Sequence, residues 1–297
     1  MLKDKKCHLL SKYEPSAVSY QKITKEEAGW QHLNFEARSI KKNDTWKGDS
    51  EENEYLFILL GGSFKAKTPQ GTWETTNSRK NVFSGLPHAF YVPPHTSFEI
   101  TALTEELDIA AGYCRSDVDH IPVMINPEDV EKHGIELRGG DNASRQINSI
   151  LPPGSPFGRL VCVEVYTPSG NWSSFPAHKH DQRKTDENGL VREASLEEVY
   201  FYKIDKPQGF AIQKVYTDDR SLNEIAELHN NDAMLVPKGY HPVAAGHGYN
   251  VYYLNFLAGS DQSLANTNDP DHEWIYDSWK TMDERLPLVN LQMNYGR

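Results

Sequence analysis

The sequence consists of short apolar or alternating runs that end at turn-forming residues. Such runs end before Gly61-Gly62, Pro93-Pro94, Pro168 and Gly259. Runs of this length, bounded by Gly, Pro, Asn and Asp, are typical of strands in a β-sandwich or barrel. Helix signals are few, with one helix start at Asn126-Pro127. The chain therefore predicts an all-β protein with few short helices.

Composition limits the class of partner. The 297 residues include 31 basic and 42 acidic side chains, a net charge of -11. Such a balance disfavours nucleic-acid binding, which relies on basic surface. No run has the length of a membrane span, and Met1–Leu10 lacks the apolar core of a signal peptide. Cys7, Cys114 and Cys162 lie far apart, so we expect free thiols and a soluble cytoplasmic protein.

Three histidines and one glutamate stand where strands can bring them together. His178 and His180 are two residues apart, so on a strand both imidazoles project from one face and Lys179 from the other. Glu198 opens the apolar run Val-Tyr-Phe-Tyr, and His241 follows a Pro-Lys-Gly-Tyr turn. We predict that these four residues bind one divalent metal ion.

The donor set indicates a catalytic metal. Imidazole and carboxylate suit Zn or Mn first, with Fe, Co and Ni as alternatives, and four protein ligands leave coordination positions open. Glu197 is the rival of Glu198, since only one of two adjacent strand residues points inward. The alternative is that the histidines make ordinary hydrogen bonds. We expect the following histidines to be structural or exposed: His88, His95, His229 and His247.

The chain also repeats itself at a separation of 144 residues. Residues 198–201 align with 54–57, and residues 235–237 align with 91–93. The alignment places Glu54 opposite Glu198, which is why we prefer Glu198 to Glu197 as the ligand. Two matches at one separation favour a duplicated β-domain.

The first copy lacks the histidines of the second. At the same separation, Asn34, Glu36 and Ser97 stand opposite His178, His180 and His241 in that order. A turn-rich stretch over residues 139–156 suits a domain boundary. We therefore expect an N-terminal domain without a metal site over 1–148 and a C-terminal domain with the metal site over 149–297.

At these residues the chain resembles a bicupin, a protein of two tandem cupin domains with a jelly-roll (double-stranded β-helix) fold. Gly170, His178-x-His180, Glu198 and Gly209 resemble the first cupin motif, and Pro237-x-Gly239-x-His241 resembles the second. The stretch between His180 and Glu198 is longer than the general cupin pattern.

Longer strings resemble a narrower family, the 5-deoxy-glucuronate isomerases of myo-inositol catabolism. These strings cover residues 171–181, 197–202, 235–243 and 252–255, with support from 82–87 and 283–289. A sister family, the 4-deoxyuronate ketol isomerases of pectin breakdown, shares the His-x-His-Asp and Glu-Val-Tyr-Phe-Tyr patterns and fits less of the remainder.

The resemblance implies a metal-dependent aldose–ketose isomerase that converts 5-deoxy-D-glucuronate to 5-dehydro-2-deoxy-D-gluconate. Its partner would be a small sugar acid, and exposed sheet edges in bicupins favour a homo-oligomer. The 4-deoxyuronate ketol isomerase and an Fe-dependent cupin dioxygenase are the alternatives, the latter because the same ligands support oxygen chemistry. A non-catalytic sugar sensor would need an output segment, and we find no basic helix-turn-helix pattern.

Two further residues are candidates for substrate chemistry. Tyr200 shares the face of Glu198 by alternation, so we expect a proton relay or an oxygen contact, with a packed aromatic as the alternative. Arg183 follows the His-x-His-Asp run and could bind the substrate carboxylate through two parallel hydrogen bonds, with Arg79 as second choice. Asp181 either orients a ligand histidine or begins the loop.

Overall fold

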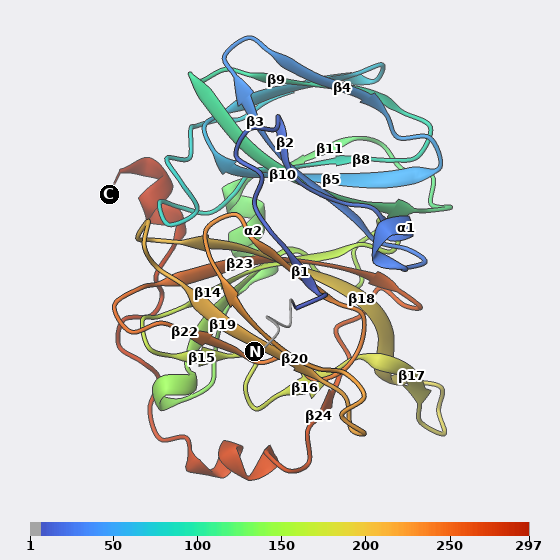
Figure 1. Cartoon of the computed structure of the whole chain (residues 1–297). Helices are drawn as coiled ribbons and strands as arrows, with labels where there is room; N and C mark the ends of the chain where they lie inside the picture. Colours follow the sequence, from blue (N-terminus) through green and yellow to red (C-terminus); the bar gives the residue numbers. More distant parts are fainter. Residues whose placement is uncertain (1–6, 297) are drawn as a thin grey trace, which may run out of the picture.

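The structure is a computed structural model that describes residues 7–296 (Figure 1). Residues 1–6 lie outside the described residues, and most of the stretch Met1–Leu10, for which we expect no signal peptide, falls among them. The described chain is built mainly of strands, which confirms the all-β prediction. The described residues form five sheets, and the four larger ones, two from each half of the chain, lie one above another in Figure 1.

The first half forms a six-stranded and a four-stranded antiparallel sheet. The six-stranded sheet has the order β11 (Val123–Ile125), β8 (Ala89–Val92), β5 (Asn53–Gly61), β10 (Glu106–Arg115), β3 (Asn34–Lys41), β2 (Ser19–Ile23). The four-stranded sheet has the order β4 (Thr45–Asp49), β9 (Ser97–Ala102), β6 (Phe64–Thr68), β7 (Gly71–Glu74). Buried side chains from both sheets, including Trp46, Phe57 and Phe98, form the core between them.

The second half repeats this arrangement. Its eight-stranded sheet has the order β1 (Leu10–Ser11), β21 (Ala233–Val236), β18 (Val191–Ile204), β23 (Val251–Gly259), β14 (Val161–Thr167), β13 (Arg145–Leu151), β12 (Ile135–Arg138), with β17 (Asp181–Thr185) also paired to β18. A four-stranded sheet has the order β15 (Trp172–Ser173), β22 (Val243–Ala245), β19 (Ala211–Tyr216), β20 (Asn223–Leu228). A two-stranded sheet joins β16 (His178–Lys179) to β24 (Thr267–Asn268).

Helical segments are short. They comprise α1 (Lys25–Ala28), α2 (Pro127–His133) and the 3-10 segments η1 (Asp141–Ala143), η2 (Glu273–Ser278) and η3 (Leu291–Tyr295). The predicted helix start is confirmed, with Asn126 as N-cap and Pro127 in the first turn of α2. None of the described helices is both long and apolar enough to cross a membrane.

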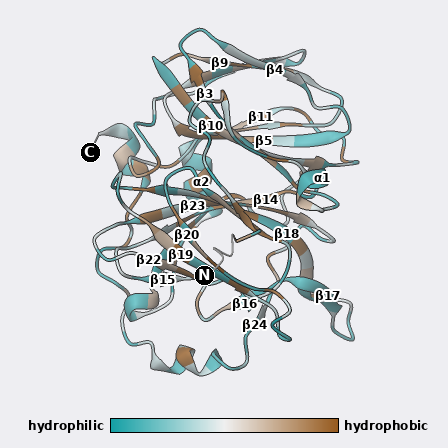
Figure 2. Ribbon diagram, in the orientation of Figure 1, coloured by the Kyte–Doolittle hydropathy of each residue, from teal (hydrophilic) through white to brown (hydrophobic). Residues whose placement is uncertain are grey.

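The two large sheets pack face to face, and this contact joins the two halves. Phe35 of β3 contacts Phe201 of β18 and Phe256 of β23, with ring centroids 5.3 and 6.0 Å apart. A Cβ atom at Gly112 would lie 2.2 Å from the Phe256 ring, so the close approach requires glycine there. Figure 2 shows apolar residues concentrated in these large sheets, while β17 and its loop are polar.

The repeat is present in the sheets, but its register differs from the sequence alignment by one residue on β5 and β18. Tyr55 pairs with Val92, and Glu198 pairs with Val236, so the counterpart of Glu198 is Tyr55. A shift of one residue moves a strand residue to the opposite face. Glu54 therefore corresponds to Glu197, and the alignment that supported Glu198 was wrong at this position.

The strands β8 and β21, which pair with β5 and β18, explain why the sequence alignment was wrong. Val92 and Val236 are 144 residues apart, whereas Tyr55 and Glu198 are one residue closer. In the large sheets, β3 lies beside β10 as β14 lies beside β23, so Asn34 and Glu36 are not the counterparts of the histidines. The segment from β18 to β21 is one residue longer than the segment from β5 to β8, so the separation of 144 that fits β8 and β21 assigns the wrong counterpart on β5 and β18.

The expected division after residue 148 falls inside β13, whose partners β12 and β14 both belong to the eight-stranded sheet. A division within a strand would separate hydrogen-bonded neighbours. We therefore propose that the two domains divide between β11 and β12, and that β1, from the N-terminal end, completes the second domain by pairing with β21.

Candidate metal centre

Three of the predicted ligands meet in the interior of the second half. The ligand atoms of His180, Glu198 and His241 all lie within 4.8 Å of one another, and all three residues are buried. His180 Nε2 lies 2.9 Å and His241 Nε2 3.4 Å from Glu198 Oε2. Among residues 7–296, no other group of His, Cys, Asp and Glu meets this criterion.

Strand alternation places Glu198 in the interior. Val199 and Phe201 belong to the core between the large sheets, while Tyr200 and Tyr202 pack inside the second half. Glu198 shares the face of Tyr200 and Tyr202, because residues two apart on a strand project to the same side. β18 therefore places the carboxylate in the same interior as the two histidines.

The loop before His241 is held by two features. Gly239 has φ 88°, and a Cβ atom there would lie 2.5 Å from the Tyr216 carbonyl oxygen, so glycine is needed. The Gly239 N–H donates to Asp181 Oδ2 at 2.9 Å. Asp181, one residue after His180, thus positions the loop before His241 through the backbone of Gly239. It forms no hydrogen bond with a ring nitrogen of His180 or His241.

The hydrogen bonds leave ring nitrogens free to bind a cation. His241 Nδ1 lies 2.8 Å from the Gly239 carbonyl oxygen, which fixes the proton on Nδ1 and leaves the Nε2 lone pair facing Glu198. His241 Nε2 and His180 Nδ1 are buried without a hydrogen-bond partner among the described residues. Buried polar atoms without partners are costly, and a divalent cation fits this donor set.

The electrostatics keep two of the imidazoles neutral. Burial lowers the pKa of His241 to about 4, although the Glu198 carboxylate opposes this. Burial, and then His241 and His180, hold the pKa of His178 well below its usual value. For His180, burial disfavours the charged form, but the hydrogen bond to Glu198 outweighs it and the pKa is raised. Neutral imidazoles are the form that binds metal.

His178 lies beside this group, but its ring nitrogens are not within 4.8 Å of the ligand atoms of all three other residues. Its ring packs edge-on against His241, with centroids 5.0 Å apart, and the residue is half-buried. Lys179 projects the other way and pairs with Asp218 above the Tyr240 ring, as alternation predicts. The structure therefore brings three predicted ligands together and places the fourth next to them.

Glu197 faces away from the metal centre. Its carboxylate accepts the backbone N–H groups of Gln31, His32 and Leu33 at 2.6, 2.9 and 2.9 Å. Its counterpart Glu54 accepts the N–H groups of residues 158–160 in the second half. One glutamate in each half thus accepts hydrogen bonds from three consecutive backbone N–H groups in a loop of the other half.

Tyr200 lines the same interior as Glu198. Its ring lies 5.6 Å from the His241 ring, and its hydroxyl is 3.1 Å from Ser174 Oγ. Ser174 is also 3.5 Å from the Tyr253 hydroxyl. Burial, and then the Glu198 charge, raise the pKa of Tyr200 well above its usual value, so the phenol stays protonated.

The two predicted arginines lie elsewhere. Arg183 is exposed on β17 and binds Asp261 through Nε and Nη2 at 2.9 and 3.2 Å. Arg79 is fully buried and pairs with Glu164 at 2.8 Å, and its other N–H groups donate to backbone carbonyls and the Tyr166 hydroxyl. Neither guanidinium faces the three-residue group in this arrangement.

The other histidines lie outside the group. His95 and His247 are exposed. His88 is buried with Nε2 accepting the Thr76 N–H at 3.2 Å, and His229 Nδ1 contacts the Gly209 carbonyl oxygen at 3.1 Å. Sequence reasoning missed Tyr253, which lies beside Tyr200 and Ser174, and Arg145, which donates to the Phe175 carbonyl oxygen. Arg145 lies in the turn-rich stretch that we interpreted as a domain boundary, and no motif in the neighbouring residues indicates a binding role.

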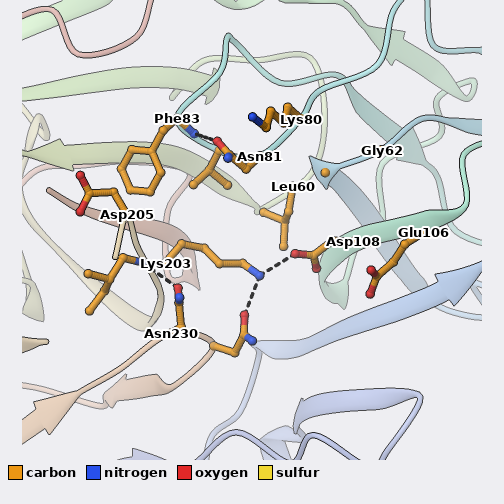
Figure 3. Close-up of a pocket in the computed structure, with 14 residues that line it drawn as sticks. Leu60, Gly62, Lys80, Asn81, Phe83, Glu106, Asp108, Lys203, Asp205 and Asn230 are labelled. Carbon is orange, nitrogen blue, oxygen red and sulfur yellow. Dashed lines mark hydrogen bonds and ion pairs between the residues drawn. The ribbon is translucent and has the colours of Figure 1, made fainter. Parts of the chain in front are cut away.

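A cavity of about 560 Å³ opens between the two halves, away from the histidines (Figure 3). Lys203 crosses it, and its Nζ bonds to Asp108 Oδ2 at 2.5 Å and Asn231 Oδ1 at 2.6 Å. The cation is therefore already satisfied by protein groups. None of the three metal-centre residues lines this cavity.

Comparison with known proteins gives the same fold and a close set of relatives. A solved structure described as an IolB-like protein from Salmonella typhimurium LT2 superposes with a TM-score of 0.84 at 36% identity, covering 90% of this chain and 98% of the other. An oxalate decarboxylase of Bacillus subtilis superposes with a TM-score of 0.56 at 11% identity, covering 83% of this chain and 74% of the other. The fold is the cupin fold that the sequence motifs predicted.

Curated relatives share most of their length with this chain. The 5-deoxy-glucuronate isomerase of Geobacillus thermodenitrificans is 40% identical over 272 residues, 91% of this chain and 96% of the relative. That of Bacillus licheniformis is 37% identical over 275 residues, 90% of this chain and 98% of the relative. The model of the KduI/IolB family matches residues 9–275. The chain belongs to the KduI/IolB family.

Proposed function

We propose that this protein is a metal-dependent aldose–ketose isomerase that converts 5-deoxy-D-glucuronate to 5-dehydro-2-deoxy-D-gluconate in myo-inositol catabolism. The observation that carries the proposal is the 40% identity to a curated 5-deoxy-glucuronate isomerase over nearly the full length of both chains. The buried group of His180, Glu198 and His241 supports it with a chemistry suited to the reaction.

The reaction moves a carbonyl from C1 to C2 of the sugar acid. Either a proton leaves the carbon next to the carbonyl or a hydride shifts, and in both routes negative charge develops on oxygen. A divalent metal held by His178, His180, Glu198 and His241 would supply Lewis-acid stabilisation of that charge. Zn or Mn suits these ligands best.

Tyr200 is our candidate for proton delivery at the reacting end. Its hydroxyl is held by Ser174 at 3.1 Å, and its raised pKa keeps the proton on the phenol oxygen. A protonated phenol can donate to a substrate oxygen as charge develops there. Tyr200 therefore acts as a proton donor or relay and not as the base that starts the reaction.

The metal ligands are tested by their effect on metal content. Purified His180→Ala, Glu198→Gln and His241→Ala proteins should each lose the metal that elemental analysis finds in the unmodified protein. His178→Ala should lower the metal content as well. Full metal occupancy in His178→Ala would remove His178 from the ligand set and leave the other three.

The activity is tested by incubating the purified protein with 5-deoxy-D-glucuronate without oxygen and following the ketose by NMR. Conversion under these conditions supports the isomerase. Oxygen uptake with bound Fe(II), without isomerisation, would instead indicate a dioxygenase, and turnover of a 4-deoxyuronate alone would indicate the sister activity. We further propose a cytoplasmic location, which suits three free cysteines.

A further inference from the structure

Arg145 is a buried cation whose charge is not neutralised by a neighbouring acid. It begins β13 and is 5% exposed. Its Nη1 donates to the carbonyl oxygens of Ala143 at 3.3 Å and Phe175 at 3.1 Å. Among residues 7–296, no carboxylate forms an ion pair with it, and its Nε and Nη2 groups donate to no protein group and retain some contact with solvent.

Such an arrangement is unusual for a buried arginine. Buried charges in proteins are normally paired, because removing an ion from water is expensive. Arg79 shows the ordinary case in this same chain, since it pairs with Glu164 and donates every N–H group to an acceptor. Burial lowers the pKa of Arg145 instead, which agrees with the missing counter-charge. A guanidinium in this state is ready to bind an anion.

Arg145 faces the same interior as the metal centre. The Phe175 carbonyl that it contacts lies three residues before His178. Ile147, two residues further along β13 and therefore on the same face as Arg145, packs against the buried cluster that contains Tyr200 and Tyr253. The Tyr253 ring lies 4.8 Å from the Tyr200 ring, which in turn lies 5.6 Å from the His241 ring. Arg145 is therefore on the side of its sheet that carries the metal centre.

We propose that Arg145 binds the carboxylate of the sugar-acid substrate while the opposite end of the sugar lies at His180, Glu198 and His241. This inference rests on the proposed function, in which the carboxylate and the reacting carbonyl stand at the two ends of a six-carbon chain. A guanidinium can bind a carboxylate through two parallel N–H donors, which fixes its orientation as well as its charge. Arg145 is thus a substrate-binding residue, in place of Arg183, which already binds Asp261.

The test compares Arg145→Gln with the unmodified enzyme in steady-state kinetics on 5-deoxy-D-glucuronate. The loss of a charge-assisted bidentate contact should raise KM by about 10- to 100-fold, with a smaller change in kcat and an unchanged metal content. Arg145→Lys keeps the positive charge but lacks the two parallel N–H donors, so its KM should lie between those of the unmodified enzyme and Arg145→Gln. Arg192→Gln, which removes an exposed arginine paired with Asp186, is the matched control.

A structural role would give a different pattern. Because Arg145 lacks a counter-charge, Arg145→Gln should melt at the same temperature as the parent or higher. A lower melting temperature with an unchanged KM would overturn the inference and assign a structural role. If the glutamine variant does not fold, Arg145→Lys decides, since a parental KM in that variant would also contradict a bidentate contact.

Direct binding separates this inference from the isomerase proposal. Calorimetric titration with D-glucuronate and with D-glucose should show a preference for the acid in the parent protein and none in Arg145→Gln. If the parent binds the acid through Arg145 but does not isomerise 5-deoxy-D-glucuronate, the proposed function fails and the carboxylate site stands. If it isomerises the substrate without preferring the acid, the carboxylate site fails and the function stands.

Discussion

Glu197 and Glu198 are neighbours on β18, and their carboxylates serve opposite faces of one sheet. Glu197 accepts three backbone N–H groups from residues 31–33 of the first half. Glu198 faces the interior of the second half, 2.9 Å from His180 Nε2. The same strand thus fastens the two halves together and supplies the metal centre with its carboxylate.

Substitution of each glutamate should separate these two roles. Glu198→Gln should lose the metal, and its isomerase activity should fall by at least 100-fold. Its melting temperature should stay close to that of the metal-free parent protein. Glu197→Gln should keep the metal and lose about 2 kcal/mol of stability, because three charge-assisted hydrogen bonds are weakened. Elemental analysis and urea unfolding measure both. Equal metal loss in the two variants would contradict the assignment of faces.

Tyr200 and Tyr202 form a second matched pair on β18. Tyr200→Phe should lower kcat by about 100-fold with metal content intact, because it removes the proton donor beside His241. Tyr202→Phe loses only a hydrogen bond to Gln213 Oε1 at 2.8 Å, so it should cost about 1–3 kcal/mol of stability and keep kcat. Near-normal turnover in Tyr200→Phe would remove that residue from the mechanism and leave it as a packed aromatic.

Arg79 should act on stability and not on substrate. Arg79→Met leaves the buried Glu164 carboxylate without its cation, so we expect a loss of about 3–5 kcal/mol in the free energy of unfolding. The double variant Arg79→Met/Glu164→Leu should recover part of that loss, because both charges are gone. KM for the sugar acid should stay the same in any variant that folds, and a large rise would return Arg79 to the substrate site.

His88 should make the fold sensitive to acid. Its folded pKa is lowered to about 4 by burial, and then by the Arg79 charge, from 6.5. Below pH 6.5 the unfolded chain binds a proton that the folded chain rejects, so stability is lost as pH falls from 6.5 towards 4. The contribution reaches about 3 kcal/mol at pH 4.

The His88 contribution is measured as a difference between two pH profiles. Urea unfolding at several pH values should give a flatter stability profile for His88→Gln than for the parent between pH 6.5 and 4. The offset between the two proteins at neutral pH is a packing effect and does not enter the comparison. Parallel profiles would show that His88 is protonated without cost in the folded state.

Local patterns in the sequence were sufficient for the strands and for the two histidines His180 and His241, but they left Glu197 and Glu198 open, and the repeat alignment that decided for Glu198 had the wrong register. Alternation along 198–202 and the turn before His241 each depend on neighbouring residues only, so the sequence could predict them. The register of the repeat was not predictable in this way. One residue of difference between β5 and β18 makes Glu197, and not Glu198, the counterpart of Glu54, and only the strand pairing reveals it.

The arginines show where sequence reasoning stops. Arg183 was chosen for its closeness to His180 in the chain, yet β17 carries it outward to Asp261. Arg145 lies 33 residues before His178 and reaches the same interior because β13 belongs to the same sheet as β18. Long-range placement of this kind depends on sheet order, which no local pattern in a single sequence specifies.

The central claim is that one divalent metal, bound at His180, Glu198 and His241 with His178 beside them, is needed for isomerisation. The most direct measurement is activity on 5-deoxy-D-glucuronate after removal of metal with a chelator and titration with Zn²⁺ or Mn²⁺. We predict that the metal-free protein is inactive and that activity returns and levels off near one metal per chain, but not in His241→Ala. Full activity in the metal-free protein, with elemental analysis showing no residual metal, would contradict the account.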